Sequence, residues 1–269
     1  MTSLDTLRRH LQGLGRVILG YSGGVDSALL AVVGTQALGA GRFLAVIGRS
    51  DSYPEVQWRA AIDVAWQFGV PLLEAETREL ADPRYVANST DRCYFCKTEL
   101  WSRLAGIAAE RGFDTVIDGT NADDLGEHRP GLKAAAERAI RSPLAELGWT
   151  KAAIRAASRE LGLPDWDAPA APCLSSRLAY GLQVTPARLR QVEDGEAFLR
   201  SLGIGGDLRV RHHGASARLE VSADEMPTVK DAWAAVERYF SSIGFESVEL
   251  DPAGYRRGGL LALASPDRS

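Results

Sequence analysis

The stretch YSGGVDS, residues 21–27, decides the fold of the first half of this chain. It follows the apolar run RVILG at 16–20 and precedes a long alanine- and leucine-rich stretch. Where a buried strand turns directly into a helix, the first helical N–H groups lack partners and carry partial positive charge, so they bind anions. We therefore predict a phosphate cradle in which glycine lets the backbone come close and Asp26 holds a cation or fixes the loop. The cradle comprises Ser22, Gly23, Gly24, Val25 and Ser27.

No lysine follows these glycines, whereas the kinase-type phosphate loop ends in Gly-Lys-Ser/Thr. The difference argues against ordinary transfer of a γ-phosphate to water or protein. For two glycines alone, a plain strand-to-helix turn with glycine at positive φ is the simpler interpretation.

The full string SGGVDS at 22–27 resembles the signature SGGxDS of the PP-loop ATP pyrophosphatases, which adenylate an oxygen and release pyrophosphate. The resemblance implies ATP and Mg²⁺ as cofactors, and adenine contacts near Arg49 and Ser50. The stretch DGTNADD at 118–124 is similar to a later strand-end loop of that family, although GTN alone is more often a plain turn. The residues implied there are Gly119, Thr120, Asn121 and Asp123 for the nucleotide and Asp124 for Mg²⁺.

Apolar runs alternate with helix-forming segments, which is the pattern of a parallel α/β sheet. We predict strands at 16–20, 43–47, 71–76 and 115–118, with helices near 25–38, 54–68, 96–111 and 150–161. A smaller α+β unit follows, with helices at 186–202 and 224–243 and strands at 207–211, 217–221 and 246–250. The fold class is therefore α/β, a Rossmann-like ATP-binding domain at 1–165 followed by an α+β domain for substrate binding and oligomerisation at 166–269. The proline-rich stretch 164–177 is the predicted linker and carries Cys173.

Composition restricts the partners. The net charge of −4 gives no global reason to expect nucleic acid, and no apolar run approaches the roughly 20 residues that span a bilayer. The N-terminal segment lacks the apolar core of a signal peptide, so a cytoplasmic location is expected. Three cysteines in a reducing compartment favour a metal or catalytic role over a disulfide framework.

Three further stretches resemble the LarE family, which installs sulfur on the pyridinium nucleotide precursor of the nickel-pincer cofactor. They are residues 141–177, RVRHHGASARLEV at 209–221 and LDPAGYRRGGL at 250–260. The resemblance covers nearly the whole chain. It implies adenylation of a carboxylate of a pyridinium dicarboxylate mononucleotide, followed by sulfur transfer.

The family has two cysteine arrangements. In one, a single cysteine at the PCLSSR position gives up its own sulfur; in the other, three cysteines hold a [4Fe-4S] cluster with one open iron. Cys93, Cys96 and Cys173 favour the cluster, because thiolates are its usual ligands and a two-residue spacing lets Cys93 and Cys96 bind one centre. A zinc half-site completed by His128, His212 or His213, a redox pair, and inert thiols remain alternatives.

Arginine suits bidentate binding of carboxylate and phosphate, and Arg177, Arg209 and Arg211 lie in motifs that match the family. They are the predicted substrate-binding residues, and by resemblance Glu220 and Glu196 contribute a metal or phosphate site. Strand alternation places Arg218 and Glu220 on one face, so surface ion pairs are the competing interpretation.

Two other functions stay open. A tRNA-thiolating enzyme would share the glycine loop but show a basic surface. A module that senses ATP without chemistry would release no pyrophosphate. A homo-oligomer and an unidentified sulfide donor complete the expected partners.

Overall fold

The structure is a computed structural model that describes residues 2–126, 130–164, 166–169 and 172–256. The chain forms two compact units. Unit 1 comprises residues 1–82 and 91–171, and unit 2 comprises 83–90 and 172–269. The predicted domain boundary at 165 and 166 stays a prediction, because residues 165 and 170–171 lie outside the described ones, as does part of the predicted linker.

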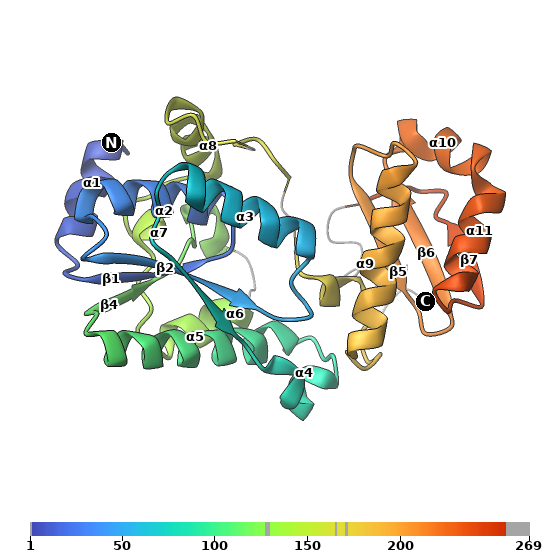
Figure 1. Ribbon diagram of the computed structural model, residues 1–269, viewed down its shortest axis with the longest axis horizontal. Coiled ribbons are helices and arrows are strands. Elements are labelled where there is room, and N and C mark those ends of the chain that lie inside the picture. Colours follow the sequence, from blue (N-terminus) through green and yellow to red (C-terminus); the bar gives the residue numbers. More distant parts are fainter. Residues whose placement is uncertain (1, 127–129, 165, 170–171, 257–269) are drawn as a thin grey trace. The chain divides into compact units, whose positions relative to one another are not determined.

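Unit 1 contains a parallel four-stranded sheet, which confirms the predicted α/β class. The strand order is β3-β2-β1-β4. Helices cover both faces, as Figure 1 shows: α1, α2, α3 and α8 lie on one side and α5 and α6 on the other. The strands are β1 (Val17–Tyr21), β2 (Phe43–Arg49), β3 (Leu72–Glu76) and β4 (Thr115–Ile117). The helices are α1 (Leu4–Gln12), α2 (Val25–Leu38), α3 (Glu55–Gln67), α5 (Arg92–Arg111), α6 (Pro130–Ala136) and α8 (Lys151–Glu160).

Both faces of this sheet are buried because successive strand residues alternate between two apolar cores. Leu19 and Ala45 pack with α1, α2 and α3, whereas Ile18 and Val46 pack with α5 and α6. Gly34 in α2 lets the helix approach β2, since a Cβ there would lie 2.3 Å from the ring of Phe43. The sheet is therefore the rigid support from which the loops of unit 1 project.

The strand order reverses beside β1. The chain runs from β1 to β2 and β3 on one side and later returns to place β4 on the other side. In open α/β sheets, ligands bind in the crevice at the carboxyl ends of the strands where the order reverses. The segments 22–27 and 118–124 follow β1 and β4, so both lie at this point.

Several elements of unit 1 differ from the sequence predictions. Helix α5 begins at Arg92, not at residue 96, because the carbonyl of Asp91 accepts the N–H of Tyr94 and starts the first turn earlier. Helices α1 and α6 were not predicted. The remaining short elements of unit 1 are η1 (Glu79–Ala81), η2 (Ala122–Gly126) and α7 (Pro143–Glu146).

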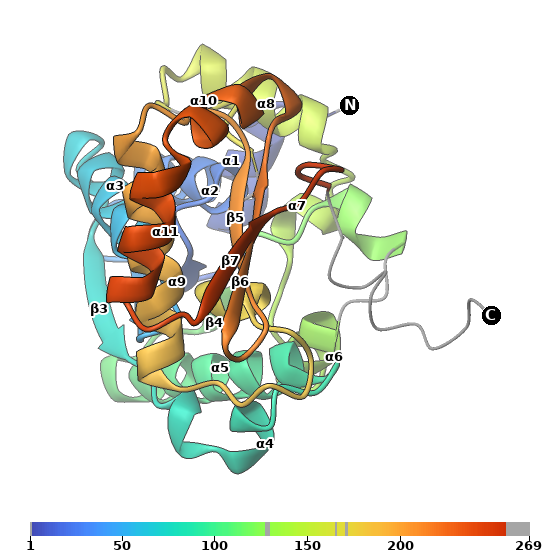
Figure 2. The same ribbon diagram turned by 90° about the vertical axis from the view of Figure 1, so that its right-hand side faces the viewer.

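Unit 2 is built on a mixed three-stranded sheet of order β5-β6-β7. Strands β5 and β6 are antiparallel, and β6 and β7 are parallel. Figure 2 shows α9 and α11 side by side on one face of this sheet. The elements are β5 (Leu208–His212), β6 (Ser216–Val221), β7 (Ser247–Leu250), α4 (Pro83–Val86), α9 (Pro186–Ser201), α10 (Met226–Asp231), α11 (Trp233–Ser242), η3 (Leu174–Arg177) and η4 (Ala223–Glu225).

The single helix predicted at 224–243 is wrong. Ala232, at φ −92° and ψ 9°, interrupts it between α10 and α11, so Val229 and Phe240 reach the same core from two shorter helices. Strand β6 alternates as expected: Leu219 and Val221 enter this core, whereas Glu220 lies on the other face. No helix in the described ranges combines the length and the apolar character that crossing a membrane requires.

His212 ends β5 as a buried neutral ring. Its Nδ1 accepts the N–H of Gly214 at 3.1 Å, and its Nε2 lies 2.9 Å from Oε1 of Gln191, to which it donates. Burial, aided by the charge of Arg188 and by His213, lowers the pKa of His212 to about 4. The ring of His212 is therefore a hydrogen-bonded part of the core. His213 follows the strand, is half-buried and faces away from the ring of His212.

This histidine makes stability depend on pH. An unfolded histidine titrates near pH 6.5, so its stabilising contribution is complete above that pH and is lost as the pH falls toward about 4, by at most about 3 kcal/mol. In urea unfolding, His212→Gln should be less stable at pH 7 but lose less stability between pH 6.5 and 4 than the unsubstituted chain. The control His10→Gln should keep the fall. An unchanged slope in His212→Gln would contradict the neutral buried ring.

Candidate functional site

The glycine loop, residues 22–27, joins β1 to α2. In the described part of the chain, the N–H groups of Gly23, Gly24 and Val25 donate no hydrogen bond, and α2 has no side-chain cap. Ser27 closes the loop, since its Oγ donates to the carbonyl of Gly24 at 3.0 Å and accepts the N–H of Ser22 at 3.2 Å. The loop thus leaves backbone donors at the positive end of a helix, as an anion site requires.

Packing dictates glycine at position 23. Gly23 has φ +69°, and a Cβ there would lie 2.6 Å from the Cβ of Ala61 in α3. Tyr53 holds the same turn, because its hydroxyl donates to the carbonyl of Ser22 at 2.9 Å. Burial raises the pKa of Tyr53 to about 12, so the hydroxyl keeps its proton. The loop conformation is therefore fixed before any ligand binds.

The second loop, residues 118–124, packs directly against the glycine loop. A Cβ on Gly119 would lie 3.1 Å from the backbone nitrogen of Ser27, so a larger residue would crowd the helix start. Nδ2 of Asn121 donates to Oδ1 of Asp26 at 3.4 Å. The structure thus brings the two predicted nucleotide-binding segments together.

Asp118 anchors the second loop and was missed by the sequence analysis. Its buried carboxylate accepts the N–H and the hydroxyl of Thr120, at 3.0 and 2.9 Å, and the hydroxyl of Ser142 at 2.7 Å. Thr120, predicted to bind nucleotide, therefore directs its hydroxyl to Asp118. An aspartate at a strand end in a GTN context is the signal that could have suggested this role.

The other acidic residues of this loop also have protein partners. Oδ2 of Asp124 accepts the N–H of Asn121 at 3.1 Å, and Oδ2 of Asp123 accepts the N–H of Lys151 at 2.8 Å. Asp123 therefore caps the N-terminus of α8. The predicted roles of these carboxylates toward nucleotide and Mg²⁺ stay predictions.

Lys151 is a second residue that the sequence analysis missed. Its Nζ lies 2.5 Å from Oδ2 of Asp26 in the glycine loop. Thr150 caps α8 by accepting the N–H of Ala153, which fixes the start of the helix and so the position of Lys151. A cation thus reaches the loop from a helix more than a hundred positions away in the sequence.

Arg49 and Ser50, the predicted adenine contacts, lie at the end of β2. The Arg49 guanidinium lies 3.9 Å from the ring centre of Trp58 and pairs with Glu55 at 2.7 Å. Ser50 Oγ lies 2.9 Å from the hydroxyl of Ser52. Both side chains are at the carboxyl edge of the sheet, on the strand next to β1.

The three cysteines are divided between the units. Cys93 and Cys96 lie three residues apart in the first turns of α5, so both project from one side of that helix, and Cys93 is exposed. Cys173 in unit 2 is half-buried and immediately precedes η3. None forms a disulfide. Among the described residues, no group of three His, Cys, Asp or Glu side chains is arranged to hold a metal ion, and His128 lies outside them.

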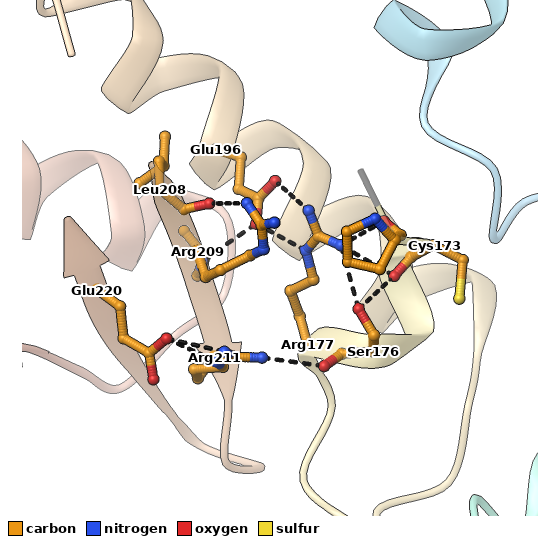
Figure 3. Close-up of polar contacts among 10 residues, drawn as sticks. Cys173, Ser176, Arg177, Glu196, Leu208, Arg209, Arg211 and Glu220 are labelled. Carbon is orange, nitrogen blue, oxygen red and sulfur yellow. Dashed lines mark hydrogen bonds and ion pairs between the residues drawn. The ribbon is translucent and has the colours of Figure 1, made fainter. Parts of the chain in front are cut away.

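The predicted substrate-binding residues of unit 2 gather around the face of β5 opposite the apolar core. Figure 3 shows the arginine cluster, formed by Arg177, Arg209 and Arg211 with the carboxylates of Glu196 and Glu220. All three arginines are at most 7% exposed. Arg211 pairs with Glu220 at 2.8 Å and donates to the carbonyl of Ser176 at 3.1 Å. The structure therefore brings these five residues together.

Arg177 holds the turn that carries Cys173. Its Nε and Nη2 donate to the two carboxylate oxygens of Glu196, at 2.9 and 3.2 Å. Its Nη1 donates to the carbonyls of Pro172 and Cys173 and to Oγ of Ser176. Figure 3 shows the Cys173 sulfur pointing away from Arg177. Every guanidinium nitrogen of Arg177 has a protein partner, so this side chain stabilises the backbone of the turn that carries Cys173.

Arg209 is the third arginine of the cluster, and its Nη1 donates to the carbonyl of Leu208. Three arginines face two glutamates in the cluster, and burial together with the charge of Arg177 lowers the pKa of Arg209. Its guanidinium also lies 5.1 Å from the ring centre of Tyr255. Guanidinium groups gathered in this way are suited to an anionic ligand by charge and by geometry.

Comparison with known proteins extends these observations. A family model described as NAD synthase matches residues 3–101. An uncharacterized protein of Synechocystis sp. is 41% identical over 261 residues, which cover 96% of this chain and 97% of that protein. The pyridinium-3,5-bisthiocarboxylic acid mononucleotide synthase of Lactiplantibacillus plantarum is 35% identical over 257 residues, 96% of this chain and 93% of that enzyme. The similarity thus extends far beyond the glycine loop.

The Arg177 contacts predict a structural penalty. Lysine keeps the charge but cannot replace a fork that binds Glu196 and two carbonyls, so Arg177→Lys should lower the free energy of unfolding by about 2–4 kcal/mol. Arg218→Lys is the matched control, since Arg218 pairs with the exposed Glu249 and should change stability by less than about 1 kcal/mol. Urea unfolding measures both. Equal, small effects would show that Arg177 is not a structural residue.

Proposed function

The chain belongs to the LarE family of ATP-dependent sulfur transferases, within the PP-loop ATP pyrophosphatases, and we propose that it converts a carboxylate of a pyridinium dicarboxylate mononucleotide to a thiocarboxylate. The product would serve synthesis of the nickel-pincer cofactor. The observation that carries the proposal is the glycine loop with its unpartnered N–H groups, in a chain similar over nearly its whole length to a synthase of such a thiocarboxylate.

The first step would use unit 1. ATP phosphates would occupy the N–H groups of Gly23, Gly24 and Val25, between the carboxyl ends of β1 and β4. A substrate carboxylate oxygen would attack the α-phosphorus, and the bond to the β-phosphate would break with release of pyrophosphate. Bound Mg²⁺, held by Asp26 and Asp124, would neutralise phosphate charge.

The second step would form the carbon–sulfur bond. A sulfur nucleophile would attack the acyl carbon, and the carbon–oxygen bond would break as AMP leaves. Adenylation is needed because a carboxylate oxygen is a poor leaving group, whereas AMP is a good one. The atoms balance as one carboxylate, one ATP and one sulfide consumed for one thiocarboxylate, one AMP and one pyrophosphate.

The arginine cluster would bind the acceptor. A pyridinium dicarboxylate mononucleotide carries carboxylates and a phosphate, which are the groups that planar guanidinium forks recognise. Arg209 and Arg211 would contact the acceptor, whereas the nitrogens of Arg177 bind Glu196 and the backbone of the Cys173 turn. Arg177 would instead position Cys173 for the sulfur chemistry.

The cysteines fit a [4Fe-4S] cluster by donor type and spacing. Cys93 and Cys96 project from one side of α5. Arg177 binds the backbone carbonyl of Cys173 and leaves the thiol of that residue unconstrained. Three thiolates leave one iron open, and the bound cluster would supply an exchangeable sulfide there. In the alternative, Cys173 alone would give up its sulfur. The sulfide donor, a homo-oligomer and a cytoplasmic location remain part of the proposal.

Iron content tests the sulfur source. Anaerobic reconstitution with iron and sulfide should give about four irons per chain and a thiolate-to-iron absorption band. Cys93→Ala, Cys96→Ala and Cys173→Ala should each lose the iron and repeated turnover. If no iron binds and the mass of Cys173 falls by one sulfur after a single turnover, the cluster is wrong and the sacrificial mechanism holds.

Acceptor dependence tests the reaction itself. Pyrophosphate should be released only when a pyridinium dicarboxylate mononucleotide is present, and Arg209→Met should weaken binding of that mononucleotide by tenfold or more while ATP binding is kept. Arg218→Met, in an exposed ion pair, is the control. Release driven by tRNA would favour the tRNA-thiolating alternative. Tight ATP binding with no pyrophosphate would favour the ATP-sensing one.

A further inference from the structure

Residues 83–90 belong to unit 2, although the residues before and after them in the sequence belong to unit 1. This segment, which we call the clamp, contains α4 and ends at Thr90, two residues before α5 begins. Cys93 follows Thr90 by three residues, which span at most about 11 Å of chain. The chain itself therefore keeps the start of α5, with its two cysteines, close to the clamp.

Tyr85 of the clamp binds the turn that carries Cys173. Its Oη lies 2.6 Å from Oγ of Ser175 in η3, and both side chains are buried. A hydrogen bond between two buried hydroxyl groups is costly to break, so it fixes the turn against α4. Cys173 precedes Ser175 by two residues, at most about 7 Å of chain. The same segment that leads into α5 therefore also holds the stretch that carries Cys173.

Asn88 joins the clamp to the chain that follows this turn. It is fully buried, and its Nδ2 donates to the carbonyls of Ala179 and Leu182, at 2.8 Å each. The N–H of Gly181 in turn donates to the carbonyl of Asn88 at 3.1 Å. Neither Asn88 nor Tyr85 belongs to the apolar core of unit 2, so polar contacts, and not packing on that core, hold the clamp in place.

We propose that the clamp holds the three thiols of this chain within reach of one another, with Tyr85 and Asn88 as positioning residues. One short segment is bound two residues from Cys173 and continues into α5 three residues before Cys93, and Cys96 lies on the same side of that helix. The proposal deepens the proposed function, on which it rests for the joint use of the thiols.

The first test needs no iron. In the reduced, iron-free chain, a short bismaleimide should join Cys173 to one of the two cysteines of α5, and mass spectrometry of the peptides measures the rate. Asn88→Asp places an acceptor where the donor to two carbonyls stood, and it should slow this cross-link at least fivefold. Tyr85→Phe keeps the ring and removes only the hydroxyl, so it tests the clamp even if Asn88→Asp folds poorly, and it should slow the cross-link at least twofold.

The matched control is Gln191→Met. It removes two side-chain hydrogen bonds in the same unit, to the carbonyl of Ile243 and to His212, and leaves the clamp intact. Its cross-linking rate should equal that of the unsubstituted chain, because general loss of stability in unit 2 does not move the thiols. Equal rates in Tyr85→Phe and Gln191→Met, or no cross-link in the unsubstituted chain, would overturn the proposal.

Iron release provides a second readout. After anaerobic reconstitution, a chelator should remove iron from Tyr85→Phe at least threefold faster than from Gln191→Met, because misplaced thiolates bind iron less tightly. Release at one rate from both variants would contradict the positioning role. If no variant binds iron, the cluster of the proposed function is wrong, and the cross-linking rates alone decide whether the clamp positions the thiols.

Discussion

The N-terminus of α2 is the constraint on which the rest of unit 1 depends. Its N–H groups can remain without protein partners only because the loop that carries them is held on every side: Tyr53 binds the carbonyl of Ser22, Ser27 closes the turn, and Gly119 packs against the backbone of Ser27. The loop is partly exposed, and its N–H groups lie at the positive end of α2, where they suit an anion. Much of the second loop serves to maintain it, with Asp118 fixing Thr120 and Asp123 fixing the start of α8.

In unit 2 the main constraint is the burial of three guanidinium groups. Each buried arginine needs acceptors for its N–H groups, and the two glutamates satisfy Arg177 and Arg211 in part. The backbone supplies the rest, and this requirement shapes the turn at Cys173: the carbonyls of Pro172 and Cys173 face Arg177 because that guanidinium needs them. The orientation of the cysteine thus follows from the electrostatics of the cluster.

Local sequence signals predicted the features that depend on residues close together in the sequence. The glycine loop, the four parallel strands and the alternation of Arg218 and Glu220 follow from turn chemistry and periodicity. The features that the sequence did not predict depend on contacts between distant segments. Nothing around Lys151 in the sequence indicates that its ammonium reaches Asp26, and the break at Ala232 follows from the shape of the core that α10 and α11 share. Arg177 was grouped with Arg209 and Arg211, but two of its partners are the backbone carbonyls of Pro172 and Cys173, which leave no trace in residue types.

Lys151 brings to the glycine loop a side-chain cation that the loop sequence itself lacks. Asp123 accepts the backbone N–H of Lys151, so the second loop, and not the glycine loop, fixes the position of this cation. In the free protein the same cation neutralises Asp26, so the site carries no unpaired carboxylate to repel an incoming phosphate. The charge at the start of α2 is therefore balanced by a helix that is distant in sequence, and only the fold creates this contact.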